Sequence, residues 1–206
     1  MKEHRALAYL VAVGGMLSIA AGAICARIAQ GEGVESLAVA AWRLTFAALA
    51  VAPAALLFDR ASLRAMTLRQ LGLALLAGAF LALHFALWIR SLALTSVASS
   101  TVLVTTNPIW IALVGFLFLR ERFNRTLLSG MALALAGSLA IFWSDRHTGG
   151  ADSLWGNFLA LAGAWCFSAY LLVGHRLRAR LTLPAYVFSV YTSAAALLML
   201  ACLLSG

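Results

Sequence analysis

Long apolar stretches alternate with short polar ones along the whole chain, and this alternation sets the predicted architecture. A helix needs about 20 apolar residues to cross the hydrocarbon core of a bilayer, and seven stretches approach or exceed that length. The pattern therefore predicts an all-α membrane protein, a polytopic helix bundle with seven transmembrane helices. The predicted spans cover residues 6–29, 37–58, 71–89, 95–119, 127–143, 154–174 and 185–204.

The fourth predicted span, residues 95–119, carries a polar segment at its centre that contains Thr106, Asn107 and Pro108. Because proline has no N–H, the carbonyl of Val104 loses its helical partner, and the helix is expected to kink there. Val104 lies about 15 Å from the start of the span, close to the bilayer midplane. An interrupted helix at this depth is typical of a solute pathway, and it is also compatible with a kink that neighbouring helices seal.

Polar residues of this span fall on two faces when they are placed at 100° per residue. The larger group is expected to face protein or water rather than lipid. Thr101 and Thr105 lie on another face, where each hydroxyl could bond back to a carbonyl of its own helix. The larger group, within an arc of about 120°, consists of Ser96, Ser99, Ser100, Thr106, Asn107 and Trp110.

Composition and charge indicate an integral membrane protein. The chain is 64% hydrophobic and 11% charged, far from the balance of a soluble domain. Its net charge of +8 does not indicate nucleic-acid binding, because the basic residues gather in loops on one side, which the positive-inside rule assigns to the cytoplasm together with the N-terminus. We expect an inner (cytoplasmic) membrane location. Trp88, Trp143 and Trp155, near the other ends of their spans, are expected to be interfacial anchors. The one-sided basic residues are Lys2, Arg5, Arg60, Arg64, Arg69, Arg120, Arg122, Arg125, Arg176, Arg178 and Arg180.

Groups that carry catalysis or bind metals are scarce in the spans. The sequence has no HExxH motif and no carboxylate within a predicted span, and its single lysine, Lys2, lies outside them. This argues against an intramembrane metalloenzyme and a retinal-binding receptor. Cys25, Cys166 and Cys202 lie in apolar stretches without metal-ligand spacing and are interpreted as small hydrophobes. We therefore expect no enzyme activity, no cofactor and no metal, with the lipid bilayer and a small solute as partners.

A faint internal repeat divides the chain into residues 1–148, with five helices, and residues 149–206, with two. Because the second unit begins after an odd number of helices, it must be inverted in the membrane, as in many secondary transporters. Small residues at four-residue spacing predict close helix packing. The repeat aligns Ala12, Gly15 and Ala21 with Ala160, Gly163 and Ala169. The small-residue stripes are Ala74, Gly78, Ala82 and Ala86, then Gly130, Ala134 and Ser138, then Ala160, Ala164 and Ser168.

Several sequence patches together resemble the EamA-type permeases of the drug/metabolite transporter superfamily. The patches are AGAICARIA with Arg27, AAWRLTFAALAVAP with Arg43, and LALTSVASSTVLVTTNPIWIALVGFLFLRERF with Pro108 and Glu121, followed by Gly130 and Gly137. The resemblance implies two five-helix repeats that transport a small metabolite or drug-like solute by alternating access. It also implies that about three helices of the second repeat are lacking, so that a homodimer or a partner that supplies them is expected. The alternative is a non-transporting membrane subunit or truncated remnant that associates by helix packing.

Arg43 and Asn107 lead the candidates for solute binding. Arg43 lies about 9 Å inside its span, at a depth where a charge costs up to about 2.5–3.5 kcal/mol. It either faces a cavity and attracts an anionic or zwitterionic solute, or it is a structural arginine that bonds to backbone carbonyls or snorkels outward. Asn107 either lines the cavity or holds the kink through an interhelical bond. The other candidates, for which packing or local bonding is the alternative, are His84 as a proton relay, Thr106, Trp110, Trp165 and Tyr170.

Three further residues are assigned structural roles. Arg27, near the outer end of the first span, is expected to snorkel or to pair with Glu32 or Glu35. Pro108 is expected to kink the fourth span. Glu121 lies between two arginines at the end of that span, where a helix C-terminus disfavours an acid, so a local ion pair is expected.

Overall fold

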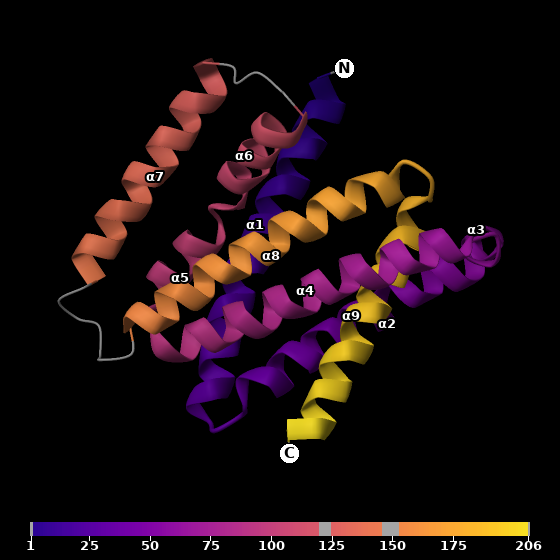
Figure 1. Cartoon of the computed structure of the whole chain (residues 1–206), viewed down its shortest axis with the longest axis horizontal. Helices are drawn as coiled ribbons and strands as arrows, with labels where there is room; N and C mark the ends of the chain where they lie inside the picture. The colour runs from indigo at the N-terminus through magenta and orange to yellow at the C-terminus, as the bar shows by residue number, and fades with distance from the viewer. Residues whose placement is uncertain (1, 120–124, 146–152, 206) are drawn as a thin grey trace.

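The computed structural model describes residues 2–119, 125–145 and 153–205, and its regular structure within these ranges is entirely helical. The prediction of an all-α fold is therefore confirmed. Figure 1 shows the arrangement of the helices. They are α1 (Lys2–Gly31), α2 (Ser36–Phe58), α3 (Arg60–Arg64), α4 (Leu68–Leu94), α5 (Val97–Val104), α6 (Asn107–Leu119), α7 (Arg125–Asp145), α8 (Ser153–Arg178) and α9 (Leu183–Ser205).

Six helical segments in the described ranges are long and apolar enough to cross a membrane. The predicted fifth span corresponds to α7, in which the described residues include the apolar stretch Leu128–Ala140. The sequence predicted seven spans, and within the described residues the structure supports six of them by length and composition. The six segments are Val13–Gly31, Ser36–Phe58, Leu68–Leu94, Val97–Phe116, Ser153–Arg178 and Leu183–Ser205.

The interruption predicted in the fourth span is confirmed. Helix α5 ends at Val104 and α6 begins at Asn107, with Pro108 in the first turn of α6. Two backbone bonds tighten the junction, from the Thr106 amide to the Leu103 carbonyl at 3.2 Å and from the Ile109 amide to the Thr106 carbonyl at 2.9 Å. Proline therefore acts here as a helix starter, a position where its missing N–H is tolerated.

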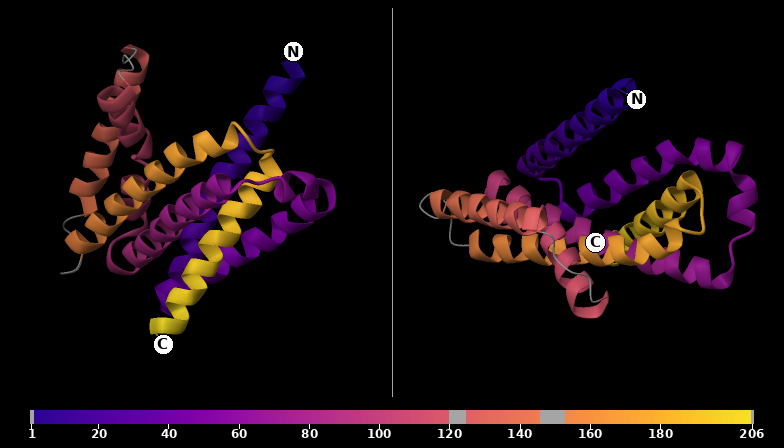
Figure 2. Two further views of the ribbon diagram at one scale, coloured as in Figure 1. Left: turned by 45° about the vertical axis from the view of Figure 1, so that its right-hand side comes forward. Right: turned by 90° about the horizontal axis from the view of Figure 1, so that it is seen from above.

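Helix α4 is the centre of the bundle. It packs along α8 on one side and against α9 on another, and α9 packs in turn against α2 (Figures 1 and 2). Gly78 is needed for the second contact, since a Cβ there would lie 2.6 Å from the Ser193 Cβ. Gly156 of α8 approaches α4 almost as closely, since a Cβ at that position would lie 2.9 Å from the Thr95 Cβ.

Small-residue stripes on α4 and α8 pack as predicted, whereas in the stripe on α7 only Ser138 is buried. Ala74 and Ala82 of α4 and Ala160 and Ala164 of α8 are buried. Gly130 and Ala134 of α7 are instead exposed and line a cavity.

Helix α1 is fastened to the end of α4 by two polar side chains. The Arg27 guanidinium donates to the carbonyl of Leu92. The Gln30 amide donates to the carbonyl of Ile89 at 2.6 Å and to the Ser36 hydroxyl at 2.9 Å. Arg27 thus has a backbone partner at the C-terminal end of α4, where a cation is favourable, rather than the acidic partner considered from the sequence.

Candidate functional site

Arg43 lies within the bundle, where α1, α2 and α4 meet. Its guanidinium carbon is 5.2 Å from the ring centre of Phe85 and 5.5 Å from that of Trp88. Both distances are within the range of cation–π attraction. On the other side the guanidinium touches the backbone of α1 at Gly22, where a Cβ would overlap it. Glycine at position 22 therefore makes room for the charge.

His84 is buried beside this cluster. Its Nδ1 lies 3.0 Å from the carbonyl oxygen of Gly163 in α8, so Nδ1 carries a proton and donates, because a carbonyl only accepts. The imidazole stacks on Trp88 with ring centres 5.8 Å apart and touches Phe167 at 4.7 Å. His84 consequently holds α4 to α8 through one hydrogen bond and several ring contacts, the packing arrangement that the sequence offered as the alternative to a relay.

Three tyrosines, Tyr170, Tyr186 and Tyr191, lie between Arg43 and the C-terminal end of α8. Tyr191 of α9 lies close enough to interact electrostatically with Arg43 and with Tyr170. The hydroxyls of Tyr170 and Tyr186 lie within hydrogen-bonding reach of each other. The Tyr186 ring rests on Gly174, where any side chain would overlap the phenol. Beyond this tyrosine pair lies a cavity of about 450 Å³ whose polar lining includes Tyr170, His175, Arg178 and Tyr186.

A second group of candidate residues surrounds the interruption between α5 and α6. The Trp110 indole donates to the Thr106 hydroxyl at 3.1 Å, and that hydroxyl donates to the Leu103 carbonyl at 2.7 Å. Trp110 meets Trp165 of α8 edge to face at 5.3 Å. The Ser168 hydroxyl lies 3.2 Å from the Asn107 carbonyl oxygen and ties the interruption to α8.

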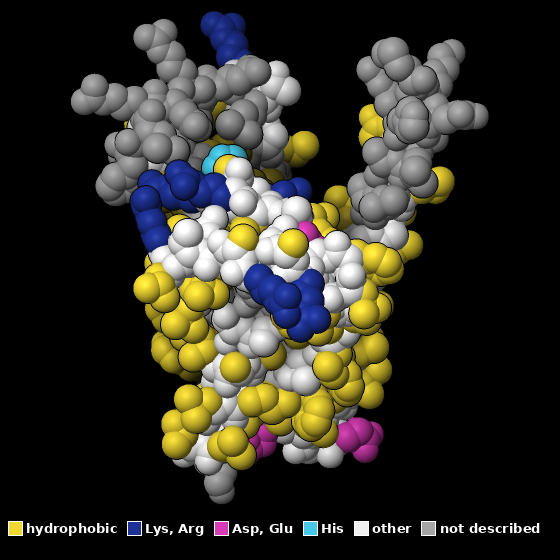
Figure 3. Space-filling model, turned by 90° about the vertical axis from the view of Figure 1, so that its right-hand side faces the viewer, with side chains coloured by type: hydrophobic (Ala, Val, Ile, Leu, Met, Phe, Trp, Pro, Cys, Tyr) yellow, Lys and Arg dark blue, Asp and Glu magenta, His cyan; other side chains and the backbone are white. Residues whose placement is uncertain are grey.

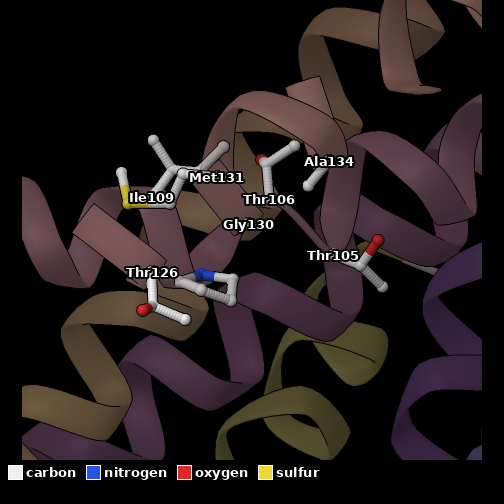
Figure 4. A pocket seen from close by; sticks show the side chains of 8 residues that line it. Thr105, Thr106, Ile109, Thr126, Gly130, Met131 and Ala134 are labelled. Carbon is white, nitrogen blue, oxygen red and sulfur yellow. The ribbon is translucent and has the colours of Figure 1, made fainter. Parts of the chain in front are cut away.

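A cavity of about 540 Å³ lies on the α7 side of the interruption. Figure 4 shows Thr105 and Thr106 among its lining together with Gly130, Met131 and Ala134. The exposed hydroxyl of Thr105 donates to the Val102 carbonyl, as predicted for this face. Most of the remaining lining is apolar, so the cavity offers few groups that could orient a polar solute.

The seven predicted binding residues therefore form two groups rather than one. Arg43, His84 and Tyr170 belong to one group, which also includes Phe85, Trp88 and Phe167 and is called the Arg43 cluster below. The other four surround the helix interruption. Since α8 contributes Tyr170 to the first group and Trp165 to the second, these groups lie on different faces of one helix, about 140° apart. The residues at the interruption are Thr106, Asn107, Trp110 and Trp165. Glu121 lies outside the described residues.

Burial supports the predicted polar face of the fourth span. Ser99, Ser100 and Thr106 are all buried, and the Ser100 hydroxyl lies 2.5 Å from that of Ser91 in α4. Thr101 differs from the prediction, because its buried hydroxyl has no partner among the described residues.

Sequence reasoning misplaced Trp88. It was expected at the membrane interface, but it is only 3% exposed and lies between Arg43 and His84. Its indole N–H is buried and has no hydrogen-bond partner in the described part of the chain. Tyr186 and Tyr191 were missed as well. A tryptophan near the end of an apolar stretch is compatible with both positions, so the sequence carried no signal that could separate them.

The side chains of the Arg43 cluster are suited to binding a ligand rather than to catalysis. It offers one guanidinium, an unpartnered indole N–H and phenolic hydroxyls in apolar surroundings. Within the described ranges, no group of three His, Cys, Asp or Glu side chains could hold a metal ion. Donors without a neighbouring carboxylate suit an acceptor such as a carboxylate or phosphate oxygen.

Comparison with known sequences gives one match. The profile of the EamA-like transporter family matches residues 6–143, which is more than half of the 206 residues. No curated protein and no solved structure matches the chain.

Proposed function

Because the chain belongs to the EamA-like transporter family, we propose that it is a membrane permease whose solute is a small anion or zwitterion bound at Arg43. The family supports membrane transport in general. The choice of solute class is supported by the charge of Arg43, which lies about 10 Å inside α2 by helical rise.

The surroundings of Arg43 favour a ligand over a purely structural charge. Arg43 is half-buried, and a cation that is largely withdrawn from water is normally paired, since it otherwise loses hydration without replacement. All seven acidic residues of the sequence lie outside the predicted spans. The contacts at Arg43 are instead the faces of Phe85 and Trp88, which attract a cation but accept no strong hydrogen bond. A solute carboxylate or phosphate would supply the missing acceptor.

Trp88 supports the same solute class independently. Its N–H lacks an acceptor among the described residues although the side chain is buried, and leaving such a donor unsatisfied costs about 1–3 kcal/mol. An anionic oxygen between the guanidinium and this indole would satisfy both donors. The rings of Phe85 and Phe167 nearby would contact an apolar part of the solute.

The cavity of about 450 Å³ is our proposed access route to Arg43, with the Tyr170–Tyr186 pair between them. The inverted repeat and alternating access remain predictions, as does an arrangement with a second copy or with additional helices. The cytoplasmic location of the N-terminus and of the arginine-rich loops is also a proposal. Cysteines introduced as Arg64→Cys and Arg178→Cys should resist an impermeant thiol reagent in intact cells, and labelling of both would reverse the orientation.

A solute screen tests the proposal directly. Purified protein is reconstituted into vesicles loaded with an equimolar mixture of neutral amino acids, organic acids and diamines, and efflux is quantified by mass spectrometry. We expect protein-dependent loss of anions or zwitterions and retention of the diamines. Arg43→Gln should abolish this loss, whereas Arg43→Lys, which keeps the charge, should retain part of it.

Arg90→Gln is the matched control. It removes the same charge from an exposed position at the end of α4, so efflux should be unchanged. Efflux of diamines, or equal efflux from Arg43→Gln and Arg90→Gln, would contradict the solute assignment. Absence of any protein-dependent efflux would contradict transport by this chain.

A further inference from the structure

A pocket at the arginine-rich end of the bundle lies apart from the Arg43 cluster. It has a volume of about 250 Å³ and lies between the first turns of α4 and the last turn of α8. Figure 3 views this end, where Lys and Arg side chains gather over the upper part of the surface above a hydrophobic region. The lining residues are Thr67, Arg69, Gln70, Leu73, Arg176, Leu177 and Arg180.

Three arginines line this pocket, and all three are exposed at the surface. Arg69 comes from α4, Arg176 from α8, and Arg180 from the turn that follows α8. None of them has a hydrogen-bond or ion-pair partner among the described residues, in contrast to Arg178, which donates to the Leu181 carbonyl at 3.0 Å. Like charges that meet without a counter-ion repel one another, so the pocket favours an anion.

One carboxylate at this end of the bundle, that of Asp59, already accepts hydrogen bonds from other residues. Asp59 accepts from the Ser62 hydroxyl at 2.6 Å and from the Thr182 hydroxyl. It therefore holds the α2–α3 junction to the turn before α9 and does not neutralise the arginine pocket.

The shape and position of the pocket suit a phosphate group. Buried Leu177 and half-buried Leu73 form its apolar lining, while planar guanidinium groups can bind phosphate oxygens in pairs. The pocket also lies where membrane spans end, which is the depth of lipid headgroups. On the adjoining surface of α4, Leu68 is 87% exposed and Leu71 is 48% exposed, so an acyl chain could pack beside the pocket.

We propose that Arg69, Arg176 and Arg180 form a binding site for a phosphate group, and that its source is the headgroup of an anionic phospholipid. The three arginines bind the phosphate oxygens, and Leu68 and Leu71 contact the acyl chain. A lipid held in this way clamps the start of α4 to the end of α8. This site does not depend on the proposed solute, because no residue is shared with the Arg43 cluster.

The test uses the purified full chain in a neutral detergent. Unfolding temperature is measured while short-chain phosphatidylglycerol, short-chain phosphatidylcholine or inorganic phosphate is added. We expect saturable stabilisation by phosphatidylglycerol and none by phosphatidylcholine. Arg176→Gln and Arg180→Gln should each weaken the apparent affinity for phosphatidylglycerol about tenfold, the loss of one charge-assisted contact to phosphate.

Arg60→Gln and Arg64→Gln are matched controls, since they remove the same charge from α3, at the same end of the bundle but outside the pocket. Each should change the affinity less than about twofold, because a charge outside the pocket acts only through a screened field. Equal weakening by pocket and control variants would show diffuse attraction and overturn the site. Saturable stabilisation by inorganic phosphate that Arg180→Gln weakens would support phosphate binding and overturn the lipid as its source, while no stabilisation by either compound would overturn both.

Discussion

Substitution of Gly22 distinguishes a solute-binding role of Arg43 from a structural role. A Cβ at position 22 would overlap the nearer guanidinium nitrogen and lie 3.0 Å from the other and 3.1 Å from the guanidinium carbon. Because ordinary van der Waals contacts begin near 3.4 Å, the guanidinium must move by roughly 1 Å in Gly22→Ala to avoid the new methyl. The charge is kept while its position changes.

That displacement should affect solute binding much more than folding. A charge-assisted hydrogen bond contributes about 1.5–3 kcal/mol, so its loss should raise the KM of the solute found by the efflux screen about tenfold to a hundredfold. Alanine is favoured over glycine in a helix by up to about 1 kcal/mol, which offsets weaker cation–π contacts of about 0.5–2 kcal/mol. The unfolding temperature should therefore remain within about 4 °C of the wild type.

Gly15→Ala is the control, because a Cβ at position 15 of the same helix would meet nothing within 4 Å. Uptake kinetics and thermal unfolding are measured for both variants in parallel. Identical KM values in Gly22→Ala and Gly15→Ala would refute the assignment of the guanidinium to the solute site. A large fall in the unfolding temperature of Gly22→Ala alone would instead show that Arg43 mainly holds α1 to the bundle.

Three further outcomes are expected. Gly78→Ala should lower the unfolding temperature by several degrees, since overpacking costs about 1–3 kcal/mol. Gly72→Ala should not lower it, because a Cβ at position 72 would meet nothing within 4 Å. Equal unfolding temperatures of the two variants would show that α4 and α9 move apart at no cost. Tyr170→Phe removes the hydroxyl that bonds Tyr186 and should change the transport rate without unfolding the protein, so an unchanged rate would exclude this pair from the access route. Hydrogen bonds, first from Ser62 and then from Thr182, lower the pKa of the Asp59 carboxyl below its usual value of 3.8. The stabilisation by ionised Asp59 is therefore fully present above pH 3.8 and is lost as the pH falls through the lowered pKa. Asp59→Asn should remove this contribution to acid unfolding, which is measured by circular dichroism.

The helix interruption was predictable because its causes are local. Proline removes one backbone donor at a known position, and the carbonyl four residues earlier is fixed by helix geometry. The break between Val104 and Asn107 follows from Pro108 without any knowledge of the neighbours. The buried face of Ser99 and Ser100 was predictable for a similar reason, since polar side chains on one helical face avoid lipid.

Tertiary partners could not be derived in the same way. Arg43 was identified as a buried charge, but its contacts with Phe85 and Trp88 depend on how α2 and α4 cross. Aromatic side chains are compatible with lipid, with the interface and with the protein interior, so their sequence positions do not decide among the three. The same ambiguity applies to α7, because the apolar pattern marks a helix there but does not establish that it spans the bilayer.

The division of the candidate residues between two faces of α8 could not be predicted either, because it depends on tertiary contacts. Composition selected polar and aromatic residues near the middle of the spans, and it gave no reason to separate Trp165 from Tyr170. Five residues along a helix turn the side chain by about 140°, so the first contacts Trp110 at the interruption and the second contacts Phe167 beside His84. Since Ser168 lies between them and bonds to the Asn107 carbonyl, α8 contacts both groups. A movement of α8 relative to α4 would therefore change the geometry of both groups together.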